Sequence, residues 1–207
     1  MYLCPRNRYV RAVNDYVKQS ALKHESTLSF LKALALNPGA TGAVLPSSKY
    51  LAGTMASYAH FAENSLIVEL GAGTGVITTA MIEAGIPPKQ IIAIEYAPQL
   101  AHKLRENFPE VEVIEGNAAY LKDFLKDRGQ AITTIISGLP LRSLPKDVSQ
   151  AILEQIPMLL VRGGRYIQFT YDIRNSSPYC PQHCKLETSA IVWWNIPPAK
   201  IEVFRVE

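Results

Sequence analysis

The sequence lacks the features that define several large classes of protein. It has no run of about 18 consecutive apolar residues, so we expect no membrane-spanning helix. Only three of the 207 residues are cysteines, an odd number that makes no disulfide framework and predicts the reducing cytoplasm. Neither sign of charge predominates, because 21 Lys and Arg are nearly balanced by 18 Asp and Glu. Pro5 and scattered charges interrupt the front of the chain, so we expect no secretory leader.

Most of the excess charge lies at the front of the chain. Residues 1–36 carry six basic and two acidic side chains, a net charge of +4, which leaves −1 for the rest. Val10, Val13 and Val17 recur at helical spacing, and no proline or glycine interrupts residues 8–36. We therefore predict a basic amphipathic helical region over residues 1–36. This region packs on its own domain, lies on an anionic membrane surface or covers the active site, and the sequence leaves these alternatives open.

Residues 37–207 are predicted to form one domain, because 207 residues with 48% hydrophobic side chains suffice for a single well-buried core. Short apolar runs alternate with helical patterns along this stretch. The predicted strands are 67–70, 90–96, 111–115, 132–137, 166–170, 186–195 and 200–206, and the predicted helices are 48–61, 76–84, 98–107, 119–126 and 148–161. The pattern predicts an α/β fold with a doubly wound, mostly parallel seven-stranded sheet whose last two strands form a hairpin.

The first strand of this pattern runs into a glycine-rich turn. Glu69 closes the strand and is followed by Gly71, Gly73 and Gly75, so the spacing is G-x-G-x-G and differs from the dinucleotide fingerprint G-x-G-x-x-G. Glu95 closes the next strand and offers a carboxylate to the two hydroxyls of a ribose. Together these motifs predict a nucleoside-cofactor site. The alternative is a tight strand–helix turn that binds no ligand.

The residues that follow each strand extend this site, since ligands of open α/β sheets bind at the carboxyl ends of the strands. The stretch Glu69–Gly75 resembles the glycine loop of class I S-adenosylmethionine methyltransferases. Asn117 stands where those enzymes usually place an Asp for the adenine amino group, and its amide oxygen can also accept. The small-residue loop before the first predicted helix supplies Ser47. The predicted cofactor-binding residues are Ser47, Glu69, Gly71, Ala72, Gly73, Gly75, Glu95, Tyr96, Asn117, Ala118 and Ser137.

Five segments together resemble one family: 43–48, 69–75, 137–141 (Ser-Gly-Leu-Pro-Leu), 168–171 (Gln-Phe-Thr-Tyr) and 194–200. The family is the soluble bacterial phospholipid N-methyltransferases, class I S-adenosylmethionine-dependent enzymes related to the ribosomal RNA adenine dimethylases. The resemblance implies a Rossmann-like fold, S-adenosylmethionine as cofactor, and stepwise methylation of phosphatidylethanolamine toward phosphatidylcholine. It also implies a peripheral enzyme on the inner face of the bacterial membrane, with the basic front region as its membrane contact.

The stretch 171–178 is less similar to this family, so ornithine lipids are a neighbouring class of substrate. Amine methylation needs a neutral lone pair, and an ammonium with a pKa of about 10 must first lose its proton. We predict that Tyr171 assists and faces the growing cation, while the Ser137 hydroxyl and the carbonyl of Gly138 or Leu139 orient the amine. Glu69, His60 and His183 are the other candidate proton acceptors.

Two other functions compete with lipid methylation. A nucleic-acid adenine methyltransferase would share fold and cofactor, but such enzymes usually place an aromatic where Leu141 stands, and they need a wider basic surface. A non-catalytic lipid- or nucleotide-binding module would bind its ligand without catalysing a reaction. Cys180, His183 and Cys184 are closely spaced, yet a zinc site needs a fourth ligand, so we predict free thiols and no metal. The oligomeric state is not predicted.

Overall fold

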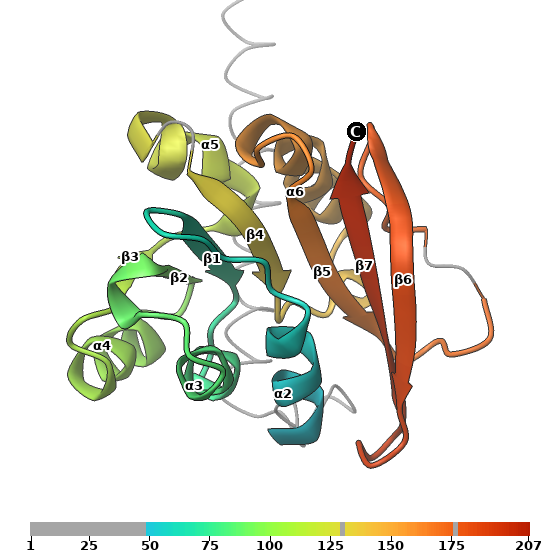
Figure 1. Cartoon of the computed structure of the whole chain (residues 1–207), viewed down its shortest axis with the longest axis horizontal. Helices are drawn as coiled ribbons and strands as arrows, with labels where there is room; N and C mark the ends of the chain where they lie inside the picture. Colours follow the sequence, from blue (N-terminus) through green and yellow to red (C-terminus); the bar gives the residue numbers. More distant parts are fainter. Residues whose placement is uncertain (1–48, 129–130, 176–177) are drawn as a thin grey trace, which may run out of the picture.

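A computed structural model describes residues 49–128, 131–175 and 178–207 of the chain (Figure 1). The predicted helical region 1–36 and the loop that contains Ser47 lie outside these residues. The predicted division into an extension and a catalytic domain therefore stays a prediction.

One seven-stranded sheet forms the centre of the described structure, in the order β3-β2-β1-β4-β5-β7-β6. The strands are β1 Leu66–Leu70, β2 Ile91–Glu95, β3 Glu112–Glu115, β4 Ile132–Ser137, β5 Arg165–Thr170, β6 Cys184–Val192 and β7 Ala199–Val206. The first five strands are parallel, and β7 is antiparallel to both β5 and β6. The predicted mostly parallel, seven-stranded fold is confirmed.

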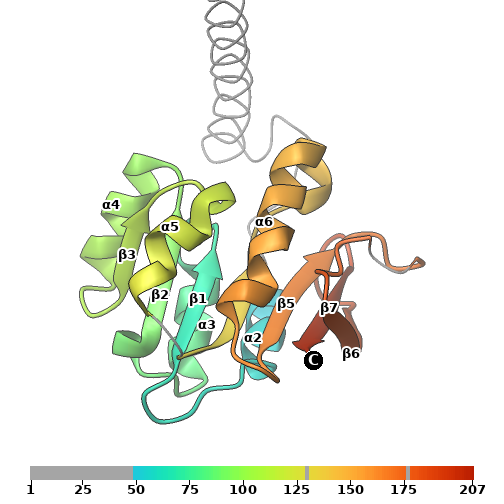
Figure 2. The same ribbon diagram turned by 90° about the horizontal axis from the view of Figure 1, so that it is seen from above.

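Helices cover both faces of the sheet (Figures 1 and 2). Helices α2 (Lys49–Ser57) and α3 (Val76–Glu83) pack together on one face, while α5 (Leu121–Leu125) and α6 (Lys146–Leu159) lie on the other. Helix α4 (Pro98–Asn107) contacts β2 and β3. The chain thus forms the three layers of a doubly wound α/β fold.

Strand β1 shows why the parallel strands have continuous apolar runs in the sequence. Ile67 contributes to the core on the α2–α3 side, whereas Val68 and Leu70 contribute to the core on the α5–α6 side. A parallel strand covered by helices on both faces must bury both sets of alternating side chains. The polar exceptions in these strands, Glu69 among them, therefore need a specific explanation.

Several element boundaries differ from those predicted. The helix predicted to reach residue 61 ends at Ser57, where the Tyr58 and Ala59 N–H groups donate to the carbonyls three residues earlier. The strand predicted to reach residue 195 ends at Val192, whose carbonyl accepts the Asn195 N–H at 3.3 Å and closes a turn. Short 3-10 helices occur at Pro88–Gln90, Ala118–Tyr120, Lys126–Arg128 and Leu141–Ser143.

No helix within the described ranges is long and apolar enough to cross a membrane.

Helix α2 offers a paired test of the packing on the α2–α3 face. Met55 is fully buried there, so Met55→Ala is expected to lower the free energy of unfolding by about 2–5 kcal/mol through lost contacts and a cavity. A Cβ at Gly53 meets nothing within 4 Å, so Gly53→Ala should raise it by about 0.5–1 kcal/mol. Urea unfolding of both variants measures these changes, and equal effects of the same sign would contradict this packing.

Candidate functional site

The candidate site lies at the carboxyl edge of the parallel strands, where β1 and β4 are neighbours and the strand order reverses. Backbone hydrogen bonds join the loops after β1 and β4 to the ends of the neighbouring strands β2 and β1. The Gly71 N–H donates to the Ile94 carbonyl at 2.8 Å, and the Gly138 N–H donates to the Leu70 carbonyl at 2.8 Å. The glycine loop is therefore fixed between its two neighbouring strands.

Two glycines allow these loops to approach each other so closely. Gly71 has a φ of +69°, and a Cβ there would overlap the Leu139 side chain. A Cβ at Gly138 would lie 2.9 Å from the Gly71 carbonyl oxygen. The predicted cofactor loop and the predicted acceptor loop 137–141 are thus in direct contact, although they are far apart in the sequence.

Glu95 ends β2 and holds the glycine loop. One carboxylate oxygen accepts the Gly73 N–H at 2.8 Å and the other accepts the Ala97 N–H at 2.8 Å. Each oxygen has further lone-pair capacity, so these bonds leave acceptor sites for hydroxyl groups. The predicted contact of Glu95 with a ribose stays a prediction, and the structure adds a second role in positioning the loop.

Glu69 lies fully buried beneath the same loop. Its Oε2 accepts a hydrogen bond from the Thr78 hydroxyl of α3 at 2.5 Å, and its Oε1 has no hydrogen-bond partner in the described part of the chain. Burial raises the pKa of this carboxyl to about 8, the Thr78 hydrogen bond lowers it in part, and the nearby Glu95 carboxylate raises it again. With no ligand beside it, Glu69 therefore holds a proton at neutral pH.

The residues after β2 and β3 complete this side of the edge. The Asn117 amide oxygen accepts the Ala119 N–H at 2.9 Å and so caps the short helix that begins at Ala118. Tyr96 is partly exposed and Ala118 is nearly buried. Because the cap occupies part of the acceptor capacity of Asn117, its predicted contact with an adenine amino group stays a prediction.

A buried polar network supports the loop after β4. The Gln168 amide of β5 donates to the Leu139 carbonyl at 3.0 Å and to the Phe169 carbonyl at 2.9 Å, and its oxygen accepts the Tyr166 hydroxyl at 2.7 Å. Ser137 is fully buried and accepts the Leu139 N–H at 3.3 Å. The Ser137 hydroxyl thus supports the loop from below, and its predicted contact with the amine stays a prediction.

Gln168 is one of several site residues, with Thr78, Asp172 and Asn195, that the sequence analysis did not single out, although it lies in a quoted motif. Its signal in the sequence is a long polar side chain between the apolar residues Ile167 and Phe169 of β5. A buried amide of this kind has to be hydrogen-bonded, and its partner here is a loop about 30 residues away in sequence.

Tyr171 follows β5 directly and is half-buried at the same edge. Its ring packs edge-on against Phe169 with 5.5 Å between ring centroids, and its hydroxyl is hydrogen-bonded to the Asn195 side chain. Burial raises the pKa of the Tyr171 phenol, against a smaller lowering by Asn195. The phenol is therefore protonated at neutral pH, which favours a role for its ring and its hydrogen bond over one as a base.

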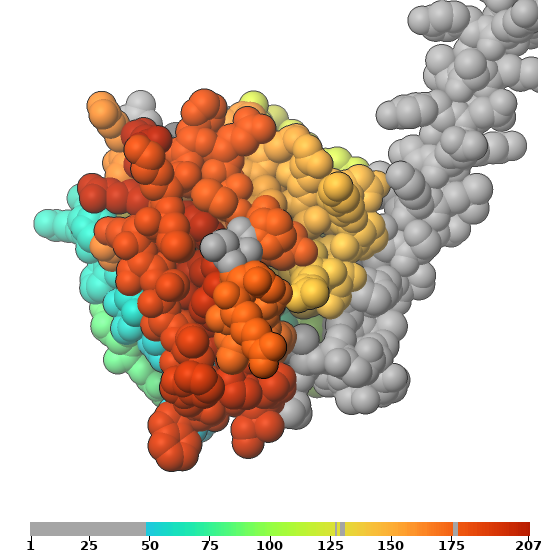
Figure 3. Space-filling view, turned by 90° about the vertical axis from the view of Figure 1, so that its right-hand side faces the viewer, coloured from blue at the N-terminus to red at the C-terminus, as the bar shows by residue number. Residues whose placement is uncertain are grey.

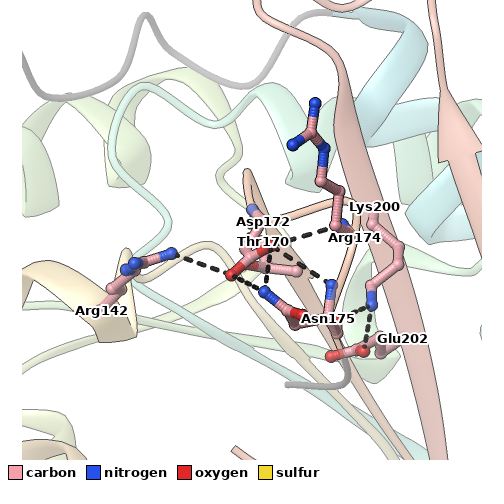
Figure 4. Close-up of polar contacts among 7 residues, drawn as sticks. All are labelled: Arg142, Thr170, Asp172, Arg174, Asn175, Lys200 and Glu202. Atoms are coloured by element: carbon pink, nitrogen blue, oxygen red, sulfur yellow. Dashed lines mark hydrogen bonds and ion pairs between the residues drawn. The ribbon is translucent and has the colours of Figure 1, made fainter. Parts of the chain in front are cut away.

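The loop after Tyr171 is ordered by one carboxylate. Asp172 accepts from the Asn175 side chain at 3.2 Å and from the Arg174 N–H at 3.3 Å, and it pairs with Arg142 at 3.3 Å (Figure 4). These hydrogen bonds, first those from Asn175, lower the pKa of Asp172. Arg142 comes from the end of the loop after β4, so this pair links the two loops of the predicted acceptor side.

A nearly buried lysine fixes the same loop to the hairpin. Lys200 of β7 donates to the Asn175 carbonyl at 2.5 Å and pairs with Glu202 at 2.9 Å (Figure 4). The segment that departs from the family resemblance is thus attached to the sheet by a defined set of contacts.

The two candidate histidines lie away from this edge. The His60 carbonyl accepts from Thr133 and Thr134 at the start of β4, and the His183 carbonyl accepts the Glu207 N–H beyond the end of β7. Both positions are at the amino-terminal edge of the parallel strands, because β7 runs antiparallel to β5. The expectation that His60 or His183 assists the amine is therefore wrong.

Burial raises the pKa of both described cysteine thiols. Cys180 and Cys184 are free, and burial raises the pKa of the Cys184 thiol to about 11. No group of three or more His, Cys, Asp or Glu side chains in the described ranges could hold a metal ion.

The polar groups at this edge fit a cationic nucleoside cofactor. Two carboxyl groups, Glu69 and Glu95, lie close together under a loop whose three glycines all have positive φ, and one buried acceptor oxygen of Glu69 is unpaired among the described residues. A bound positive charge would stabilise these acids as carboxylates. The fold and this edge define a methyltransferase of the class I type.

Comparison with known proteins agrees with this class. A family model described as "Methyltransferase domain" matches residues 67–164. The chain is 32% identical over 135 residues to an ornithine lipid N-methyltransferase from Singulisphaera acidiphila, which covers 63% of this chain and 70% of that protein. The chain belongs to the class I S-adenosylmethionine-dependent methyltransferases, and S-adenosylmethionine is its cofactor.

Two further similarities are more distant. The chain is 35% identical over 91 residues to the ribosomal RNA small subunit methyltransferase A of Chlorobaculum parvum, which covers 44% of this chain and 30% of that protein. The solved structure of the N-methyltransferase NodS from Bradyrhizobium japonicum, in complex with S-adenosyl-L-homocysteine, aligns with a TM-score of 0.57 at 12% identity over 77% of this chain and 85% of that one. At this identity the likeness shows the fold alone.

Glu69 makes the stability of the protein depend on pH. Its pKa is about 8 in the folded chain and 4.5 in the unfolded one, so the folded state holds the proton more tightly. The contribution to stability is full below the unfolded pKa and is lost as the pH rises through about 8. Between about pH 6 and 8 the free energy of unfolding should fall by up to about 1.4 kcal/mol per pH unit more than in Glu69→Gln.

Urea unfolding without cofactor at a series of pH values measures the difference. Parallel pH profiles of the native protein and Glu69→Gln would show that Glu69 is ionised in the folded state.

Proposed function

We propose that this methyltransferase transfers methyl groups to the amine of a membrane-lipid head group. The observation that carries the proposal is the similarity to an ornithine lipid N-methyltransferase over 70% of that relative. Ornithine lipid is therefore the first acceptor to test. Phosphatidylethanolamine is the second, on the strength of the motif Ser137–Leu141 and the segment 194–200.

The cofactor supplies an electrophilic methyl group on a sulfonium, and the residues of this chain bind it and prepare the amine. The glycine loop, Glu69 and Glu95 would hold the cofactor. The backbone of Gly138 and Leu139 lies directly against that loop. The Leu139 carbonyl already accepts from Gln168 and from the Leu141 N–H, so the Gly138 carbonyl is the acceptor that we propose for an amine N–H. Gln168 fixes the Leu139 carbonyl in place from below. Tyr171 lies at the rim of the same edge, where its ring can face a cation.

The proton on the amine sets the main energetic requirement. An ammonium with a pKa of about 10 is neutral once in about a thousand at pH 7, which corresponds to about 4 kcal/mol. Desolvation against the apolar residues of the edge lowers the pKa of an amine and offsets part of this. Because Tyr171 holds its proton at neutral pH and Glu69 is fully buried beneath the glycine loop, we propose that the amine loses its proton to water before it is buried.

A labelled-cofactor assay tests the acceptor class. The full chain is incubated with labelled S-adenosylmethionine and vesicles of ornithine lipid or of phosphatidylethanolamine with phosphatidylglycerol, and ribosomal RNA is a separate arm. Label is expected in methylated lipid. Gly71→Ala, strained at a φ of +69° and overlapping Leu139, should lose at least about 100-fold in rate, about 2.7 kcal/mol, while Gly53→Ala should keep its rate.

Label in RNA with none in either lipid would overturn the proposal and favour the function of the more distant ribosomal RNA methyltransferase relative.

Tyr171 separates a role for the ring from a role for the hydroxyl. Tyr171→Phe keeps the ring and should retain the rate within about fivefold, whereas Tyr171→Ala should lose about 10- to 30-fold, the upper part of a cation–π contact of about 0.5–2 kcal/mol. The loss in rate should be larger for the later methyl transfers, because the fully methylated product carries a positive charge that it cannot lose as a proton. Product distributions by chromatography measure this, and equal losses in both variants would assign the effect to the hydroxyl and its bond to Asn195.

A further inference from the structure

The turn between β6 and β7 carries an unusual group of exposed apolar side chains. Trp193 is 65% exposed, Trp194 80% and Ile196 78%. These two are the only tryptophans in the sequence. Large apolar side chains grouped on one exposed turn commonly mark a binding surface, whereas single exposed ones are ordinary.

This turn lies at the catalytic edge of the sheet. Thr170 at the carboxyl end of β5 pairs with Lys200 near the start of β7, so the turn that precedes β7 is at the same edge as the glycine loop. Asn195, within the turn, is hydrogen-bonded to Tyr171. Figures 1 and 3 show the turn projecting beyond the body of the molecule at its lower end.

We propose that Trp193, Trp194 and Ile196 insert into the interfacial region of an anionic lipid bilayer and dock the catalytic edge on the membrane. The proposal rests on the proposed function and names the surface through which that function meets its lipid. Indole rings combine a large apolar body with one N–H donor, which is why tryptophan gathers where hydrocarbon meets head groups.

The shape of the surface favours a bilayer over a protein partner. A stable protein interface buries about 1,200–2,000 Å² in a well-packed, complementary patch. Three side chains on a narrow projecting turn offer much less than this, but they suit a fluid surface that closes around them. A lipid bilayer is therefore the occupant to which we commit.

The charge at this edge agrees with an anionic surface. Helix α2 contacts β6, and its first turn, with exposed Lys49 and Tyr50, lies at the same lower end of the molecule as the turn (Figure 1). Arg174 is exposed and points away from the Asp172 cluster (Figure 4). Basic side chains beside an apolar wedge bind anionic head groups as the wedge enters the membrane.

Docking in this way would bring the active site to a lipid substrate that stays in the membrane. A head group at the membrane surface would meet Tyr171 and the loop after β4 while its acyl chains stay in the bilayer. The hydrogen bond between Asn195 and Tyr171 connects the docking turn directly to the rim of the site.

Tryptophan fluorescence tests this proposal in the full chain without a label, since both tryptophans are in the turn. Vesicles of phosphatidylethanolamine and phosphatidylglycerol are added, with or without bromine on the acyl chains. Insertion should shift the emission to shorter wavelength, and the brominated chains should quench it. Membrane binding through any other surface would leave the emission unchanged and overturn the proposal.

A paired variant measures the contribution to binding. In co-sedimentation, Trp193→Ser combined with Trp194→Ser should reduce vesicle binding at least about tenfold. Met158→Ser is the matched control, because Met158 is 62% exposed on α6, away from the turn, and its loss should leave binding unchanged. Thermal unfolding and cofactor binding are measured to check that both variants are folded. Equal binding of the double variant and the control would overturn the proposal.

The two proposals fail in different ways. If lipid is methylated, but vesicles leave the emission of the native chain unchanged and the double variant binds vesicles as well as the native chain, the docking surface is wrong and the proposed function stands. If the tryptophans insert and are quenched but no lipid acquires label, the docking surface stands and the proposed acceptor is wrong.

Discussion

The pair of hydrogen bonds that joins the glycine loop to its neighbours is the constraint on which the rest of the site depends. Gly71 donates to Ile94 on one side, and Gly138 donates to Leu70 on the other. These bonds hold the carboxyl ends of three neighbouring parallel strands, β2, β1 and β4, together at one edge of the sheet. The cofactor side and the predicted acceptor side can then share one edge, because two residues without a Cβ allow the loops to touch.

The two acids of the cofactor side have different hydrogen-bond partners although they lie close together. Glu95 accepts two backbone N–H bonds, whereas Glu69 has one hydroxyl partner and complete burial, so its pKa is about 8. Holding Glu69 neutral avoids two adjacent buried charges under one loop. A cationic ligand would change this balance, which links the electrostatics of the loop to the chemistry of the cofactor.

The acceptor side is built differently, from strands and turns that are distant in sequence. Gln168 holds the loop after β4, Lys200 holds the loop after β5, and Asn195 of the hairpin reaches Tyr171. These are polar contacts between three separate segments. The class of reaction therefore follows from the cofactor side, which the family shares, while the proposed lipid acceptor depends on how the hairpin and its exposed tryptophans complete the other side.

The sequence by itself determined the order of strands and helices, the glycine turn and the acids that end β1 and β2, because hydrophobic period and glycine spacing are local properties. It predicted the seven-stranded fold and the cofactor. Only the tertiary structure decided that Ser137 is buried, that Gln168 carries the Leu139 loop, and that His60 and His183 lie at the opposite edge. The pairing of β5 with β7 brings the tryptophan turn to the active edge, and no local pattern reports a contact between segments so far apart in the chain.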